Sequence, residues 1–186
     1  MTLENIYSEG SERMEKCISQ LKKDFVSIRT GRANPLILDK IMVDYYGAPT
    51  PLRQMSQVSV QDGTTLAITP FDRTIIKDIE KALVKAELGI APNNDGTTIR
   101  LVFPPLTEDK RKELCKEVKA LGENAKVAIR NIRRDMADEV KKVEKSDNLP
   151  EDAIKDAQDK IQKITDSYIK NVDEAVSIKE KEVLTV

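Results

Sequence analysis

The sequence contains no histidine and only two cysteines, and these shortages exclude several kinds of site. Histidine is the commonest general base in enzymes and a very common zinc ligand, so both kinds of site are disfavoured. Cys17 and Cys115 lie far apart and do not have the spacing of metal ligands. Each lies beside an apolar stripe, so we expect buried thiols rather than a redox pair. This cysteine usage fits a reducing cytosol.

The sequence also lacks any apolar run near the roughly 20 residues that span a membrane. No pattern typical of a signal peptide opens the chain. There is no GxxxxGK(S/T) loop for binding nucleotide phosphates, so GTP hydrolysis would need a partner. No acid pair or other catalytic cluster is recognisable. We therefore expect a cytoplasmic protein that is not an enzyme and has no metal, cofactor or membrane partner.

Charge is abundant but unevenly distributed along the chain. The 31 lysines and arginines nearly balance the 32 aspartates and glutamates, which argues against a wholly basic nucleic-acid coat protein. However, residues 108–134 contain nine basic and five acidic residues, whereas residues 151–182 contain six basic and nine acidic ones. This asymmetry predicts that one face of the molecule binds a polyanion.

Three long segments have the apolar spacing of helices that pack against other helices. We predict helices at 3–30, at 107–145 and from Pro150 to the C-terminus, with Gly31 ending the first. The central helix would be about 58 Å long. Its expected apolar seam consists of Leu114, Val118, Leu121, Ala125, Ala128 and Ile132.

Five basic residues of the central helix fall in a stripe about 60° wide when successive residues are placed 100° apart. They are Lys112, Lys119, Lys126, Arg130 and Arg133. We place this stripe nearly opposite the apolar seam and predict that it binds the polyanion. A plain solvated helix surface is the alternative. Lys116 and Arg134 lie off the stripe and are expected to form surface ion pairs.

The segment between the first two long helices has the pattern of a small α+β unit. Alternating apolar residues predict strands near 41–46, 58–60, 65–69 and 98–103. Gly47 to Pro51 is predicted to be a loop, and a helix is expected from Asp72 to Gly89.

The predicted fold is therefore α+β, with an elongated antiparallel three-helix bundle and an inserted small β/α/β domain. The bundle would contain residues 1–30 and 106–186, and the insertion residues 31–105, in an L-shaped molecule. Two adjacent connections, at 29–31 and 103–106, would form a hinge. Gly31 could also be a plain helix stop, and the prolines could merely end a strand. The predicted hinge residues are Arg29, Thr30, Gly31, Arg32, Pro104, Pro105 and Leu106.

Four sequence segments, in order and suitably spaced over the whole chain, resemble the ribosome recycling factor family. They are IRTGRANP at 28–35, YYGAPTPLRQ at 45–54, FPPLTEDKRKEL at 103–114 and AIRNIRRD at 128–135. The resemblance implies an outline like that of a transfer RNA, and a factor that binds the large ribosomal subunit after termination. With elongation factor G and GTP, such a factor separates the ribosomal subunits.

The resemblance also implies partners and site residues. Arg111, Arg130 and Arg133 correspond to arginines that contact ribosomal RNA, and Arg32 belongs to the family's GR motif beside the joint. Elongation factor G would face the inserted domain and supply the GTP hydrolysis. We expect a monomer. The alternatives are an enzyme and a helical adaptor, and an adaptor would bind no ribosomes and show little salt dependence.

Overall fold

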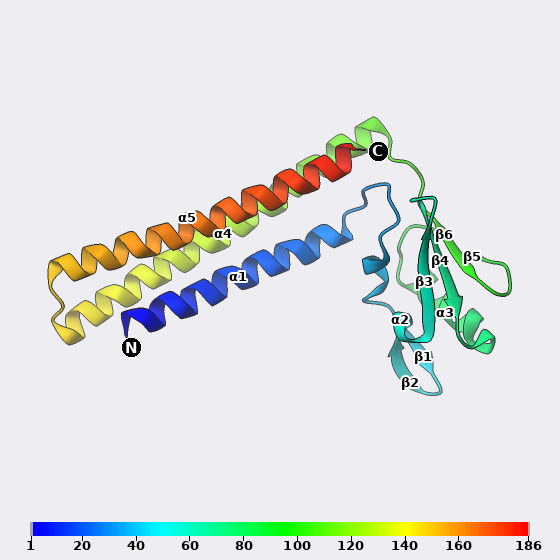
Figure 1. The fold of residues 1–186 in the computed structure, drawn as a ribbon, viewed down its shortest axis with the longest axis horizontal. Helices are drawn as coiled ribbons and strands as arrows, with labels where there is room; N and C mark the ends of the chain where they lie inside the picture. Colours follow the sequence, from blue (N-terminus) through cyan, green and yellow to red (C-terminus); the bar gives the residue numbers. More distant parts are fainter. Residues whose placement is uncertain (1, 186) are drawn as a thin grey trace. The chain divides into compact units, whose positions relative to one another are not determined.

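The computed structural model describes residues 2–185, which form two compact units. The first unit contains residues 2–28 and Arg111–Thr185, and it consists of long helices. The second unit, Arg29–Lys110, contains two small sheets and short helices. Figure 1 shows both units along the chain. The predicted combination of a helical bundle with a small sheet domain is confirmed.

The bundle consists of three helices that lie side by side (Figure 1). They are α1 (Leu3–Ser27), α4 (Glu108–Asp147) and α5 (Glu151–Leu184). The Thr2 side chain caps α1 by accepting a hydrogen bond from the Asn5 backbone N–H at 3.3 Å. Each helix buries a row of apolar side chains against the others. In α1 this row consists of Ile6, Met14, Ile18, Leu21 and Phe25.

The first helix ends earlier than the sequence predicted. It stops at Ser27, and Ile28 is already extended, with φ −80° and ψ 124°. Gly31 does have a positive φ of 78°, but it lies beyond the helix and does not end it. Ile28 remains buried, so the apolar spacing continued past the point where the helical backbone stopped. The prediction of a helix to Thr30 is therefore wrong by three residues.

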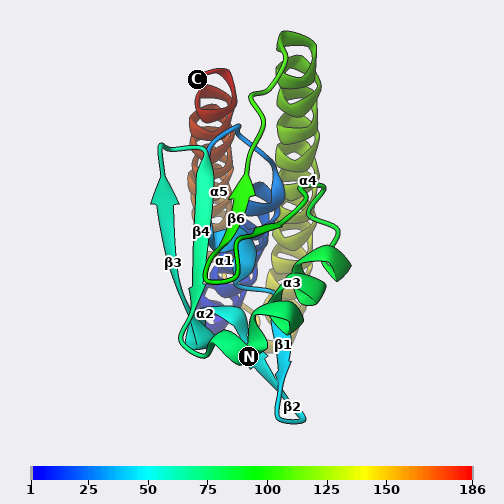
Figure 2. The ribbon, with the colours of Figure 1, turned by 90° about the vertical axis from the view of Figure 1, so that its right-hand side faces the viewer.

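The second unit contains a four-stranded antiparallel sheet in the order β3-β4-β6-β5 and a separate two-stranded sheet. Strands β3, β4 and β6 lie side by side in Figure 2. The strands are β1 (Met42–Tyr45), β2 (Ala48–Pro51), β3 (Ser56–Gln61), β4 (Thr65–Pro70), β5 (Asn93–Asn94) and β6 (Ile99–Val102). The helices are η1 (Pro35–Leu38), α2 (Leu52–Met55), η2 (Arg73–Ile75) and α3 (Ile76–Lys85).

Strand β2 was predicted to be a loop because it contains two prolines. It pairs with β1 in antiparallel register, with Pro49 opposite Asp44 and Pro51 opposite Met42. The next residue, Leu52, donates its backbone N–H to the Ile41 carbonyl at 3.0 Å. Hydrogen bonds in an antiparallel pair alternate along the strand, so both prolines occupy positions whose N–H is not needed. The loop prediction is wrong for this reason.

The core of the second unit lies between the sheet and α3. Leu66 and Ile68 of β4 and Ile99 and Leu101 of β6 point inward at the two-residue period of a strand, and all are fully buried. Helix α3 covers them with Ile79, which is fully buried, and with its neighbours on the same face. Burial of one such aliphatic side chain contributes about 1.5–3 kcal/mol. The insertion therefore has an apolar core of its own.

Between β5 and β6, the Asp95 carboxylate organises a tight turn. One carboxylate oxygen accepts hydrogen bonds from the backbone N–H groups of Thr97 and Thr98, at 2.9 and 2.8 Å. The other accepts one from the Arg100 guanidinium at 2.6 Å. These hydrogen bonds hold the pKa of the Asp95 carboxyl far below its usual range, with the Thr97 backbone N–H making the largest contribution.

The Asp95 turn predicts a defined pH dependence of stability. Because its pKa is lowered on folding, the carboxylate stabilises the folded unit above the unfolded-state pKa of about 4, and this contribution is lost as the pH falls further. Asp95→Asn should therefore unfold more easily than the parent protein at pH 7, and the gap should shrink towards pH 3. Urea unfolding at several pH values measures this. A gap that grows on acidification would contradict the assignment.

Candidate nucleic-acid interface

The candidate site lies on α4, and its position relative to the buried face differs from the prediction. The buried residues are Leu114, Val118, Gly122, Ile129, Ile132, Met136, Val140 and Val143. Leu121, Ala125 and Ala128, which were predicted to form the seam, are only half-buried. At 100° per residue, the basic stripe therefore lies beside the buried face rather than nearly opposite it. The buried face is about as wide as the predicted seam, but it is turned towards the basic stripe.

Three residues of the predicted stripe reach side chains of α5. Lys119 forms an ion pair with Glu180 at 3.3 Å, and Lys126 forms one with Asp173 at 2.5 Å. Arg133 donates from Nη1 to Oε1 of Gln162 at 3.0 Å. Gln162 in turn donates to Asp166 at 2.8 Å. The cations are seven residues apart on α4, and their partners run in the opposite direction along α5, as expected for antiparallel helices.

Lys126 is much more enclosed than Lys119. Its side chain is 16 % exposed, and its ammonium group also contacts the Glu123 carboxylate at 3.1 Å. The hydrogen bond to Asp173 raises the pKa of Lys126 above its ordinary value, and the bond to Glu123 contributes in the same direction. The group therefore stays charged at neutral pH while it joins α4 to α5. Its position favours a role in bundle assembly.

Three other cations of α4 project into solvent and form the surface that we call the outward row: Lys116, Arg130 and Arg134. All three side chains are exposed, and none forms a side-chain hydrogen bond or ion pair within residues 2–185. The expectation that Lys116 and Arg134 form surface ion pairs is therefore wrong. They are four residues from Lys112 and Arg130 respectively, so each continues the same side of the helix. That spacing was the signal in the sequence.

Arg111 lies apart from the outward row. It is half-buried at the start of the bundle's second segment, and its Nε atom is buried without a hydrogen-bond partner among the described residues. Lys112 follows it and is exposed. The six predicted RNA-binding residues therefore occupy three settings. Arg130 and Lys112 are exposed, Lys119, Lys126 and Arg133 contact α5, and Arg111 is half-buried.

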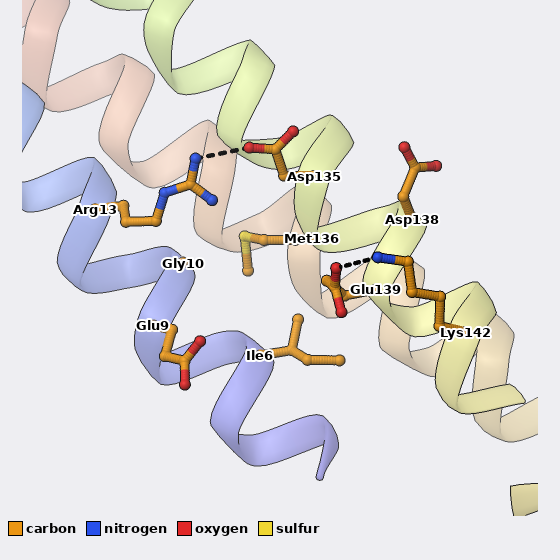
Figure 3. A pocket seen from close by; sticks show the side chains of 9 residues that line it. All are labelled: Ile6, Glu9, Gly10, Arg13, Asp135, Met136, Asp138, Glu139 and Lys142. Atoms are coloured by element: carbon orange, nitrogen blue, oxygen red, sulfur yellow. Dashed lines mark hydrogen bonds and ion pairs between the residues drawn. The ribbon is translucent and has the colours of Figure 1, made fainter. Parts of the chain in front are cut away.

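The opposite edge of α4 faces α1 and is mainly acidic. A groove of about 400 Å³ lies between the two helices. Figure 3 shows Met136 projecting towards Gly10 at its centre, and an ion pair from Arg13 to Asp135, 2.6 Å long, joining the helices above it. A side chain at Gly10 would overlap Met136. The lining residues are Ile6, Glu9, Gly10, Arg13, Asp135, Met136, Asp138, Glu139 and Lys142. This edge is unsuited to a polyanion.

The predicted hinge residues occupy the edges of the second unit, which begins at Arg29. Arg29 donates from Nη2 to the backbone carbonyl of Leu88. Thr30 is half-buried, Gly31 is buried and Arg32 is exposed. At the other connection, Pro104 and Pro105 are exposed and Leu106 is half-buried.

Residues 2–185 contain no candidate metal-binding cluster and no candidate membrane span. Across residues 2–185, no acids, cysteines or histidines gather in a group that could hold a metal ion. No helix in the same range is both long enough and apolar enough to cross a membrane. Cys17 and Cys115 are free and half-buried, and burial raises the pKa of the Cys17 thiol.

The known proteins that this chain resembles are ribosome recycling factors. The family model for ribosome recycling factor matches residues 21–184. The ribosome-recycling factor of Caldicellulosiruptor saccharolyticus is 51 % identical over 177 residues, which cover 95 % of this chain and 96 % of that protein. The factor from Ligilactobacillus salivarius is 53 % identical over 181 residues, covering 97 % of both chains.

Two solved structures are similar over nearly the whole chain. A solution structure of the ribosome recycling factor has a TM-score of 0.84 and 33 % identity, and the match covers 100 % of this chain and 99 % of the other. A model of the T. thermophilus ribosome recycling factor, bound with E. coli elongation factor G to the E. coli post-termination complex, has a TM-score of 0.67 and 42 % identity. That match covers 99 % of this chain and 100 % of the other.

Proposed function

This chain belongs to the ribosome recycling factor family, and from that premise we propose that it splits ribosomes after termination. It binds the large ribosomal subunit of the post-termination complex and, with elongation factor G and GTP, separates the subunits for reuse. It is not an enzyme, and it works in the cytoplasm as a monomer. Elongation factor G supplies the GTP hydrolysis.

The observation that carries this proposal is the exposed cationic side of α4. Arg130 and the rest of the outward row have no internal ion pairs among the described residues, so their charge is available to a polyanion. Guanidinium groups bind phosphate oxygens through paired hydrogen bonds. A straight, rigid helix that presents them recognises the shape of an RNA backbone rather than a base sequence.

We propose different roles for the six predicted RNA-binding residues. Arg130 contacts phosphate directly. Arg133 has one N–H group bound to Gln162 and keeps its other donors for RNA. Lys119 and Lys126 hold α4 against α5 and contribute charge at the edge of the surface. Lys112 and Arg111 extend it towards the start of α4.

The participation of elongation factor G is supported by one of the similar structures, which contains a family member together with elongation factor G on a post-termination complex. We propose that the insertion faces this partner and that a joint near Arg29 and Pro104 transmits its motion to the bundle.

Light scattering tests the proposal. Ribosomes carrying messenger RNA and a deacylated transfer RNA are mixed with this protein, elongation factor G and GTP. We expect scattering to fall, as subunits separate, only when all components are present. The controls omit one component at a time or replace GTP by a non-hydrolysable analogue.

A helical protein adaptor is the competing function. If scattering does not change with a matched elongation factor G, and the protein does not co-sediment with large subunits, the recycling function is wrong. Protein partners of the bundle would then be the object of study.

A further inference from the structure

The two connections of the second unit are both fastened to that unit by backbone hydrogen bonds. On the first connection, the Ala33 backbone N–H donates to the Gly63 carbonyl at 2.9 Å. On the second, the Phe103 backbone N–H donates to the Thr64 carbonyl at 2.8 Å. Gly63 and Thr64 are neighbours in the turn between β3 and β4. One turn therefore anchors both connections.

The first connection has a second anchor at its very start. The Arg29 guanidinium donates to the carbonyl of Leu88, in the loop that follows α3. The next residue, Gly89, has a φ of 69°, a conformation that favours glycine. A Cβ atom at Gly89 would overlap Nη2 of Arg29. The loop thus provides both an acceptor and the space for the guanidinium.

These anchors enclose Thr30, Gly31 and Arg32, three of the residues predicted to form the hinge. The segment is held at Arg29 on one side and at Ala33 on the other, so it is a strap on the second unit. Ile28, one residue earlier, is 6 % exposed and belongs to the bundle. The part of the first connection that neither anchor holds is therefore short.

We propose that Arg29 is a positioning residue for ribosome splitting, acting as a latch that closes on Leu88 and Gly89. This inference rests on the proposed function. With the latch closed, fewer backbone bonds of the first connection are free to rotate. A force on the insertion is then passed to the bundle. With the latch open, residues 29–32 are released from the second unit and become part of a longer, flexible connection. Part of the same force then moves the insertion without moving the bundle.

Three variants test the latch. Arg29→Ala removes the guanidinium, and Gly89→Ala displaces it. Gly96→Ala is the matched control, because Gly96 also has a positive φ, 93°, but a Cβ atom there meets nothing within 4 Å. It therefore introduces similar backbone strain without touching Arg29. Arg29→Ala combined with Gly89→Ala completes a double-mutant cycle.

Two readouts separate the latch from general damage. The first compares the rate of ribosome splitting with the affinity for large subunits. We expect splitting to slow several-fold in Arg29→Ala and Gly89→Ala while affinity is unchanged. The second readout is the distribution of distances between two spin labels in the full-length protein. The labels are attached at Ser19→Cys on the first unit and Ser59→Cys on the second, and Cys17 and Cys115 are replaced by serine. We expect this distribution to broaden in the same two variants only.

The double-mutant cycle identifies the mechanism. If Gly89→Ala acts through Arg29, it should broaden the distribution no further when Arg29 is already replaced by alanine. Additive broadening, or a distribution unchanged by Arg29→Ala, would overturn the latch. The distance measurement needs no ribosomes, so failure of the parent protein to split ribosomes would refute the proposed function without affecting this test.

Discussion

The double variant Arg130→Ala/Arg133→Ala is expected to bind large ribosomal subunits roughly a hundredfold more weakly, because removing each guanidinium–phosphate contact costs about 1.5 kcal/mol or more. The Arg130 side chain is exposed, and Gln162 holds the Arg133 side chain one turn away. Titration of labelled protein with large subunits at several salt concentrations measures the affinity. The log–log salt slope should become shallower by roughly 0.7–0.9 for each phosphate that is no longer neutralised.

A matched control is available on α5. Lys163→Ala/Lys170→Ala also removes two positive charges, in this case from exposed positions on another helix of the bundle. Its affinity should stay close to that of the parent protein, and both double variants should keep the parent's helical circular dichroism. An equal loss in the two variants would mean that net charge alone governs binding, and the site on α4 would have to be abandoned.

Ile129→Ala is expected to lower the free energy of unfolding of the bundle by about 2–5 kcal/mol. The Ile129 side chain is 0 % exposed between the helices, so its truncation leaves a cavity in addition to the lost burial. Urea unfolding followed by circular dichroism at 222 nm measures the change, because most of the helix in the chain belongs to the bundle.

Val127 provides the comparison for Ile129, two residues away on the same helix. Its side chain is 50 % exposed, so Val127→Ala should change stability by no more than about 0.5 kcal/mol. If the two variants lost similar stability, the buried face of α4 would be assigned incorrectly. The orientation of the outward row would then be wrong too.

The α4 seam illustrates where a sequence pattern is sufficient and where it is not. Apolar spacing predicted the helix and its ends within two residues, and it identified Leu114, Val118 and Ile132 as buried. The predicted seam left out Ile129, which is fully buried, and the buried Gly122, which adds nothing to an apolar pattern. In the structure, a Cβ atom at Gly122 would lie 2.5 Å from Cγ2 of Val176 on α5. The missing side chain permits this close approach, which depends on the partner helix.

The candidate site was predictable to a similar extent. The sequence identified a basic helix, and the resemblance identified Arg111, Arg130 and Arg133. Neither could reveal that Lys126 is enclosed by Asp173, because that contact depends on the register between α4 and α5. Lys116 and Arg134 were expected to form ion pairs because they lie off the predicted stripe, and the structure shows that this position does not provide them with partners among the described residues. The roles of all these residues in RNA binding, like the L-shaped outline, stay predictions.

The small sheets show the same limit on local rules. Asp62-Gly63 predicted the turn between β3 and β4 correctly, because both residues adopt positive φ there, 54° and 70°. The rule that proline disfavours strands failed for β2, where pairing places Pro49 and Pro51 at positions that need no N–H. Such exceptions depend on the strand register, which the sequence pattern did not specify.

The central claim is that the outward row of α4 lies against ribosomal RNA, and tethered cleavage tests it most directly. In a chain with Cys17 and Cys115 replaced by serine, an iron chelate is attached at Val127→Cys, three residues from Arg130 on the same side of the helix. A chelate at Ser177→Cys, exposed on α5, serves as the comparison. We predict strong, localised cleavage of large-subunit RNA from position 127 and much weaker cleavage from position 177. The reverse pattern would contradict the account, because it would place α5 rather than the outward row against the RNA.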